Sequence, residues 1–501
     1  VVAIYRDFPE PSSVAKNDMY MGMIPLEQHD RSNWNDPFYL RLKPGSSPEA
    51  VEKKMADHWR EQAANEGYTQ EEIEREIAGY APRLNNVRDL YFSKDVEYND
   101  GLTGNIATTY TLLSIAVLII VIAFINFINF FFALIPVRLR AVNICKVFGA
   151  STRTLRWSFL FEAVGLVVCA LLLTMYLTIV LPDTFVAEYV SRSLSLKDNL
   201  TAVLLLFGIG VVAALAAALY PSYYITSFNA SLAVKSGFAV SVTGRRMRLI
   251  LTGVQFIISI ALIIVSAAFW TQYRYMMRFD MGFDRDNLLV FESTGSIAGR
   301  GNAFLSYLES DPDIAAVTTA SVDVIGLENT KSWWVDDIFV EVRNCDVRYN
   351  FFDVMGIPLI DGEGFSPSDE NRNRGVVINR YLAETMNRNV GDLLNPLGRV
   401  AGITDDVMMH DVSQNKQFMA WECGTDNMRF FYVRVHGGSD IKRVCDFIRK
   451  AVQQFDPAAD EPSIEFVDQH VARLYDKVKR QTVLVSMFAL LSVGISLMGV
   501  F

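Results

Sequence analysis

Five long apolar stretches constrain the fold of this chain more than any other feature of its sequence. A helix of about 20 apolar residues is long enough to cross the hydrocarbon core of a membrane. Buried helices of a soluble protein rarely give five such runs, and the whole chain is 51% hydrophobic and only 20% charged. We therefore predict transmembrane helices at residues 110–137, 155–181, 200–225, 249–270 and 482–501.

The charges between these stretches predict which side of the membrane each connection faces. The loop at 138–154 has four basic residues and no acidic one, and the linker at 226–248 is also basic without an acid. Short basic loops stay in the cytoplasm, so we place both there. The short loop at 182–199 has more acids than bases and is expected outside. Residues 1–109 and 271–481 then form two extracytoplasmic domains, of which the second is the larger.

The two extracytoplasmic segments have the composition of folded domains. In residues 271–481, short runs rich in β-branched and aromatic residues alternate with segments of helical spacing, which is typical of an α+β or α/β domain. The runs predicted as strands are 287–293, 315–324, 375–380, 399–407, 430–437 and 463–468. In residues 1–109, FYLRLK at 38–43 is a strand candidate, and a charged helical stretch follows Ser47. The predicted fold class is an α-helical integral membrane bundle with two α+β extracytoplasmic domains.

Motifs for metal binding, nucleotide binding and catalysis are absent from the sequence. The five histidines never fall at metal-ligand spacing, the five cysteines form no CxxC pair, and the P-loop pattern GxxxxGK[ST] has no match. The net charge of −10 also argues against a nucleic-acid partner. We predict no catalytic residue, cofactor site or metal site in this chain. Whether Cys345, Cys423 and Cys445 form a disulfide is left open.

Four side chains with a carboxylate or amide group fall within the predicted spans. An ionisable or amide group in hydrocarbon is a candidate functional group, although hydrogen bonding between helices is its commoner role. We favour packing over transport for this set. An ATP-independent secondary transporter would need charged residues near the middle of the membrane, and the set supplies too few. The four residues are Asn126, Asn129, Glu162 and Gln255.

Two runs of sequence resemble one family of membrane proteins. The run R-L-R-A-V-N-I-C-K-V-F-G-A-S at 138–151 resembles the signature R-x-R-E-I-G-I-R-K-x-x-G-A-S of FtsX-like permeases, with Ala141 where Glu is usual and Cys145 where Arg is usual. A second run, Y-P-S-Y-Y-I-T-S-F-N-A-S-L-A-V-K at 220–235, looks like the Tyr-Pro segment that closes the last helix of that permease core. The chain is identified as a member of the FtsX-like/MacB-like ABC transporter permease family.

This resemblance implies a cellular setting and a set of partners. The order of the segments is that of an eight-span member with two halves, so we expect one span before Val1 and two after Phe501. The external domains are expected to be MacB-like periplasmic domains of a multi-pass protein of the cell inner membrane. The implied partners are the lipid bilayer and a dimer of a MacB/LolD-like ATPase, which would bind ATP and Mg²⁺. A periplasmic adaptor, an outer-membrane channel or a periplasmic effector is a further candidate.

The resemblance also implies how such a chain would work. We expect Gly149 to end one helix, Ser151 to cap the next, and the basic loop to dock on the ATPase. Alternatively, its bases only fix the topology beside anionic lipid. The residues expected at the docking site are Arg138, Arg140, Lys146, Phe148, Gly149 and Ser151.

Mechanotransmission is the leading hypothesis for function. In it, ATP hydrolysis by the separate ATPase drives the periplasmic domains to export a drug, a peptide or a lipoprotein from the inner membrane or periplasm. The alternative is a signalling or regulatory scaffold that controls a cell-wall hydrolase or senses antimicrobial peptides. The sequence identifies neither the cargo nor the oligomeric state.

Overall fold

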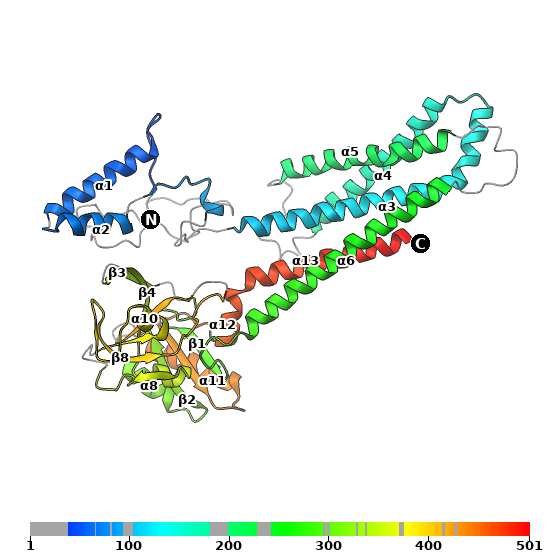
Figure 1. Ribbon diagram of the computed structural model, residues 1–501. Helices are drawn as coiled ribbons and strands as arrows, with labels where there is room; N and C mark the ends of the chain where they lie inside the picture. The colour runs from blue at the N-terminus through cyan, green and yellow to red at the C-terminus, as the bar shows by residue number, and fades with distance from the viewer. Residues whose placement is uncertain are drawn as a thin grey trace. The chain divides into compact units, whose positions relative to one another are not determined.

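The computed structural model divides into two compact units. One comprises Val1–Ser266 with Val483–Phe501, and the other comprises Ala267–Thr482 (Figure 1). The structure describes residues 39–65, 67–80, 83–93, 104–180, 199–227, 242–293, 297, 301–326, 329–335, 338–369, 375–412, 416–424 and 428–500.

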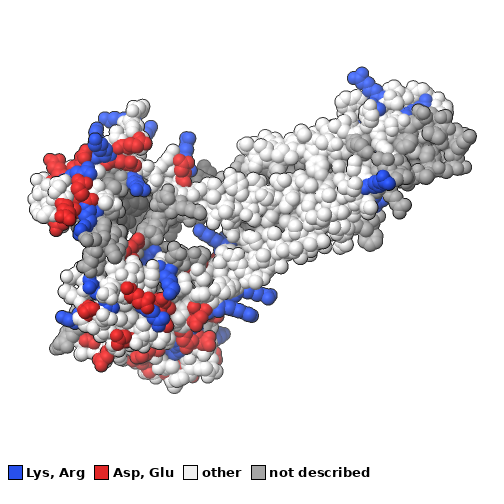
Figure 2. Space-filling view, in the orientation of Figure 1, with Lys and Arg blue, Asp and Glu red and all other residues white. Residues whose placement is uncertain are grey.

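Long apolar helices make up most of the first unit. Each contains a segment that is long and apolar enough to cross a membrane, and these segments are 106–134, 152–177, 200–227, 246–278 and 476–498. Figure 2 shows that charged side chains are sparse along these helices and gather elsewhere on the molecule. The helices are α3 (Ile106–Val147), α4 (Thr152–Val180), α5 (Leu200–Ser227), α6 (Val242–Arg278) and α13 (Asp476–Val500).

These helices extend beyond the apolar stretches seen in the sequence. The residues predicted as a basic loop after 137 instead continue α3 as far as Val147. Arginine and lysine are good helix formers, and the first glycine after the apolar segment is Gly149, so α3 continues past Pro136 to the end of this basic stretch. The predicted external loop at 182–199 lies almost wholly outside the described residues, as does most of the linker between α5 and α6.

Serine side chains join α6 and α13 along one seam. The Ser259 hydroxyl lies 2.8 Å from that of Ser492 and 2.6 Å from that of Ser496, and Ser266 lies 2.9 Å from Ser486. Because higher numbers on α6 meet lower numbers on α13, the helices run antiparallel. The buried positions of α13 recur at 482, 485, 489, 492 and 496, which is heptad spacing. Hydrogen bonds between membrane helices contribute only about 0.6 kcal/mol each, so packing of small residues supplies the rest.

We predict that a disulfide forms across this seam in the double variant Ser266→Cys/Ser486→Cys, made in a chain with Cys145 and Cys169 replaced by serine. The two hydroxyls already lie in contact, so mild oxidation of the chain in detergent should crosslink α6 to α13. Proteolysis within the intervening domain, followed by a non-reducing gel, measures it. Ser266→Cys/Leu490→Cys is the control, because Leu490 is exposed on α13. Equal crosslinking of both pairs would contradict the seam.

The second unit is a mixed sheet covered by helices. The strand order is β11-β1-β10-β2-β4-β9-β6-β8-β5, with β3 paired to β4 and β7 to β8. β4 pairs with β9, and β6 with β8, in parallel; the other pairs are antiparallel. The strands are β1 (Leu288–Glu292), β2 (Ile314–Ala320), β3 (Thr330–Val335), β4 (Ile338–Val347), β5 (Leu359–Gly362), β6 (Val376–Asn379), β7 (Leu393–Leu394), β8 (Gly398–Thr404), β9 (Phe418–Cys423), β10 (Phe430–Val435) and β11 (Glu465–Phe466). The helices are α8 (Gly301–Glu309), α9 (Phe351–Met355), α10 (Arg380–Thr385), α11 (Ile441–Phe455) and α12 (Val467–Leu474).

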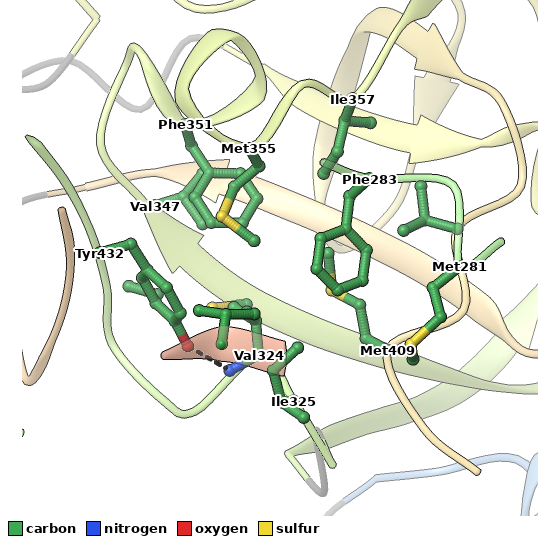
Figure 3. Packing of buried hydrophobic residues seen from close by; sticks show 14 of the residues in the cluster. Met281, Phe283, Val324, Ile325, Val347, Phe351, Met355, Ile357, Met409 and Tyr432 are labelled. Carbon is green, nitrogen blue, oxygen red and sulfur yellow. Dashed lines mark hydrogen bonds between the residues drawn. The ribbon is translucent and has the colours of Figure 1, made fainter. Parts of the chain in front are cut away.

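Alternate residues of β1 face two different hydrophobic clusters, as the pleat of a strand requires. Leu289 and Phe291 pack with α8 and α11, whereas Leu288 and Val290 belong to a cluster on the other face. That second cluster is rich in methionine and includes Tyr432, whose hydroxyl accepts a hydrogen bond from the Val324 amide at 3.1 Å (Figure 3). A third cluster, under α10, is formed by β4, β6, β8 and β9. The predicted combination of apolar helices with a mixed α+β domain is confirmed.

The described part of the first extracytoplasmic segment is helical. α1 (Pro48–Asn65) and α2 (Gln70–Tyr80) pack around Ala63, Ile73 and Ile77, and a short 3-10 helix follows at Leu90–Phe92. The helical prediction after Ser47 agrees with this structure. The strand predicted at FYLRLK is wrong for residues 39–43, which form no strand; Phe38 lies outside the described residues. An isolated strand needs a neighbour to pair with, and the described residues of this segment supply none.

Candidate functional site

Gly149 ends α3 in a left-handed conformation. Its φ is +91°, which residues with a Cβ rarely adopt. The Ala150 amide donates to the Cys145 carbonyl at 2.9 Å, and the Gly149 amide donates to the Lys146 carbonyl at 3.0 Å. This pair of hydrogen bonds is the Schellman arrangement, which satisfies carbonyls left open at a helix end.

Ser151 begins the next helix. Its hydroxyl oxygen accepts a hydrogen bond from the Thr154 amide at 3.1 Å, as an N-cap residue does. α3 and α4 are thus joined by only the four residues Phe148–Ser151, which we call the α3–α4 turn. Both ends of the turn are fixed by hydrogen bonds, so it is a rigid connection.

Apolar side chains are exposed at and beside this turn. Phe148 is 86% exposed and Val147 is 69% exposed, and Ile144, one turn earlier in α3, is also exposed. These residues lie beyond the membrane segment of α3, which ends at Leu134. These exposed apolar side chains make this end of α3 a candidate site of interaction.

The basic residues near the turn contact neighbouring helices. Lys146 donates from Nζ to the Thr226 backbone carbonyl in α5 at 2.7 Å. Arg138 forms a two-pronged ion pair with Glu162 of α4, so the structure brings together a predicted docking residue and a predicted intramembrane residue. The side chain of Arg140 lies outside the described part of the structure. Arg138 and Lys146 therefore fasten helices together, a role that their sequence pattern did not indicate.

The other predicted intramembrane residues lie on α3 and α6. Asn129 is buried, and its Nδ2 lies 3.5 Å from the Thr252 hydroxyl of α6, at the outer limit of a hydrogen bond. Gln255 is buried one turn after Thr252, and its amide has no hydrogen-bond partner among the described residues. Asn126 is half-buried. These contacts fit packing between helices, the role favoured for the set.

Sequence reasoning missed two residues at the turn. Arg156 of α4 donates from Nε to the Thr226 hydroxyl of α5 at 2.8 Å. Arg156 had been counted within an apolar span and Thr226 within a linker. No local pattern marks either residue, because each depends on a partner far away in the chain.

A charged cluster centred on His470 lies in the second unit. Its Nε2 lies 2.5 Å from Asp323, and its Nδ1 lies 2.6 Å from Glu465, which also pairs with Arg473. Burial alone would lower the pKa of His470, but its hydrogen bonds and ion pairs with the two carboxylates outweigh this and raise that pKa. A neutral imidazole can donate from only one nitrogen, so carboxylates at both nitrogens favour the charged form.

We predict that the local stability of α12 falls as pH rises. Because the pKa of His470 is raised on folding, its contribution is complete below the unfolded value of about 6.5 and is lost as pH passes the folded value. Amide hydrogen exchange of residues 467–474 in the full chain, corrected for intrinsic rates, measures this. His470→Gln removes the titration, so its protection should be lower at acid pH and change little with pH. Identical protection profiles for the two chains would contradict the prediction.

The described residues hold no group of three or more His, Cys, Asp or Glu arranged to bind a metal ion. Cys145, Cys169, Cys345 and Cys445 are free thiols in the structure. Burial raises the pKa of Cys345 to about 12, which leaves its thiol unreactive at neutral pH.

Two family models match consecutive parts of the chain. The FtsX-like permease C-terminal model matches residues 113–230, and the MacB-like periplasmic core domain model matches residues 250–451. Together they cover more than half of the chain. The first match includes the α3–α4 turn, and the second includes most of the sheet unit. No curated protein matches the chain significantly.

Solved structures similar to the chain include two from bacterial transporters. The periplasmic region of MacB from Actinobacillus actinomycetemcomitans aligns with 13% identity and a TM-score of 0.29, over 40% of this chain and 97% of that one. The extracellular domain of the noncanonic ABC-type transporter YknZ from Gram-positive bacteria aligns with 10% identity and a TM-score of 0.27, over 36% of this chain and 98% of that one.

The fold and the family matches define a multi-span membrane protein whose α+β domain is inserted between α6 and α13. The chain belongs to the FtsX-like permease family and carries a MacB-like periplasmic core domain. It is a permease of an ABC transporter, located in the inner membrane as a multi-pass protein with large periplasmic domains. The resemblance read from residues 138–151 and 220–235 is confirmed, and membership implies an ABC ATPase as partner.

Proposed function

We propose that this chain transmits the force of ATP hydrolysis from a separate ATPase dimer to its periplasmic domains. ATP and Mg²⁺ would be bound by the ATPase, since the sequence has no P-loop motif. The observation that carries the proposal is the rigid turn with exposed Phe148 at its tip. An exposed aromatic residue on a fixed turn can enter a pocket of a partner and be displaced with it.

The turn is joined directly to the membrane segments. α3 is a single helix from Ile106 to Val147, so the tip and the membrane segment belong to one continuous element. The hydrogen bonds at Gly149 and Ser151 connect it to α4 without a flexible loop. A displacement of Phe148 would therefore move both helices, where a mobile loop would absorb it.

The sheet unit also begins and ends on helices. Met276, near the end of α6, and Tyr475, just before α13, are both buried in the methionine-rich cluster of that unit. Each of these helices continues from this cluster into a segment apolar enough to cross a membrane. Movement of α6 or α13 would thus act on the core of the periplasmic domain. We further propose, from family membership, that the cargo is a drug, a peptide or a lipoprotein.

We predict that Phe148→Asp weakens binding of the cognate ATPase by roughly 30-fold. Loss of an aromatic anchor from an interface costs about 2 kcal/mol, and the added carboxylate opposes docking in an apolar pocket. Binding of the purified ATPase to the permease in nanodiscs, measured by surface plasmon resonance, tests this. Tyr68→Asp is the control, because Tyr68 is an exposed aromatic residue far from the turn in sequence. Unchanged affinity of the Phe148 variant would rule out this docking site.

A further inference from the structure

Two cations from two helices converge on one residue of a third helix. Lys146 of α3 reaches the backbone carbonyl of Thr226 in α5, and Arg156 of α4 reaches the hydroxyl of the same residue. We propose that Thr226 is the positioning residue that couples the α3–α4 turn to α5, so that a displacement of the turn moves this end of α5. This inference rests on the proposed function, because it names the point at which force leaves the turn.

The end of a helix is a suitable place for this contact. Thr226 lies in the last turn of α5, and the carbonyls toward the C-terminal end of a helix carry a partial negative charge. Lys146 donates to the backbone carbonyl of Thr226 and Arg156 donates to its hydroxyl, and hydrogen bonds from charged donors are stronger than those between neutral groups. The guanidinium of Arg156 also lies 3.8 Å from the ring centroid of Tyr223 in the same turn. α5 is thus attached to both arms of the α3–α4 hairpin.

The contact is buried beneath packed apolar side chains. Thr226 is only 2% exposed, and Ile225 beside it is completely buried. Ile225 packs with Leu139 and Val142 of α3 and with Phe159 of α4. The three helices therefore share one small core beside Thr226, and the hydrogen bonds that Thr226 accepts from Lys146 and Arg156 are partly buried, which weakens their screening by salt.

The threonine hydroxyl has a specific part in the contact. It donates to the Ser222 carbonyl at 2.8 Å and uses its oxygen to accept from Arg156. Valine has almost the same shape as threonine but can make neither bond, and it would leave Arg156 without this acceptor. Serine keeps the hydroxyl and loses only a methyl group. The Thr226→Val and Thr226→Ser variants therefore separate the hydrogen bond from the packing.

The test measures whether movement reaches the far end of α5. Spin labels are attached at Leu113 of α3 and Leu205 of α5, both of which are exposed. The distance between the two labels is measured by double electron–electron resonance on the permease in nanodiscs together with its ATPase. The measurement is made with and without trapped ATP. In the unaltered chain, we expect trapped ATP to change this distance. In Thr226→Val the change should fall by roughly half or more, while Thr226→Ser should retain it and ATPase affinity should stay the same.

A second variant keeps the test decisive if Thr226→Val folds poorly. Arg156→Gln should reduce the ATP-dependent change to a similar extent, and the double variant should be no worse than either single one, because both remove the same bond. If both single variants keep the full ATP-dependent change in label distance while the unaltered chain also responds, the role of Thr226 is overturned and the proposed function is not. A chain that binds no ATPase, or shows no ATP-dependent change even when unaltered, would overturn the proposed function and this inference with it.

Discussion

A helix in hydrocarbon must satisfy its backbone hydrogen bonds within itself, and the architecture of this permease depends on that requirement. Helical bonding in α3 does not stop where the apolar segment ends at Leu134 but continues to Val147. Pro136 has no amide hydrogen and leaves one bond of this ladder unmade, but the helix ends only before Gly149, whose positive φ is available to glycine at little cost. The turn residues therefore lie at the end of one long helix, so the proposed docking surface would move together with the membrane segment of that helix.

Features of this site that depend on residue type alone were predictable from the sequence. The apolar segments follow from hydropathy, and the roles of Gly149 and Ser151 follow from the preferences of glycine and serine at helix ends. The partners of the basic residues were not predictable. Arg138 meets Glu162 across 24 positions and Lys146 meets Thr226 across 80, so neither contact leaves a local pattern. The basic residues of 138–154 suggested a surface that faces a partner. In the structure, Arg138 and Lys146 instead bind neighbouring helices.

The same limit applies to the sheet. Strands with uninterrupted apolar or β-branched runs, such as β1, β6 and β10, were predicted from composition. β4 was missed, because it buries Arg343 and Asn344 at consecutive positions inside the sheet and so lacks the alternation of an ordinary strand. β9 was missed as well. Pairing between strands distant in sequence, such as β1 with β10, is fixed by tertiary packing that no short window of sequence contains.

The pairing between β2 and β4 is the shortest along the middle of the sheet, and this affects how the sheet can bend. These strands pair at a single register position, Ala320 with Val347, whereas the strands on either side of them are joined over five or more positions. Each side has a hydrophobic cluster of its own, and only the methionine-rich cluster extends across the junction. Two backbone hydrogen bonds, from Ser321 to Asp346 and from Arg348 to Thr319, and side-chain bonds from Arg348 and Asn350 to Val317 join the two halves there. Bending of the sheet would begin at this line, because the ladder is shortest there and flexible thioether side chains can repack without leaving a void. A force on this domain would therefore bend the sheet between β2 and β4 before it separated the longer strand pairs on either side.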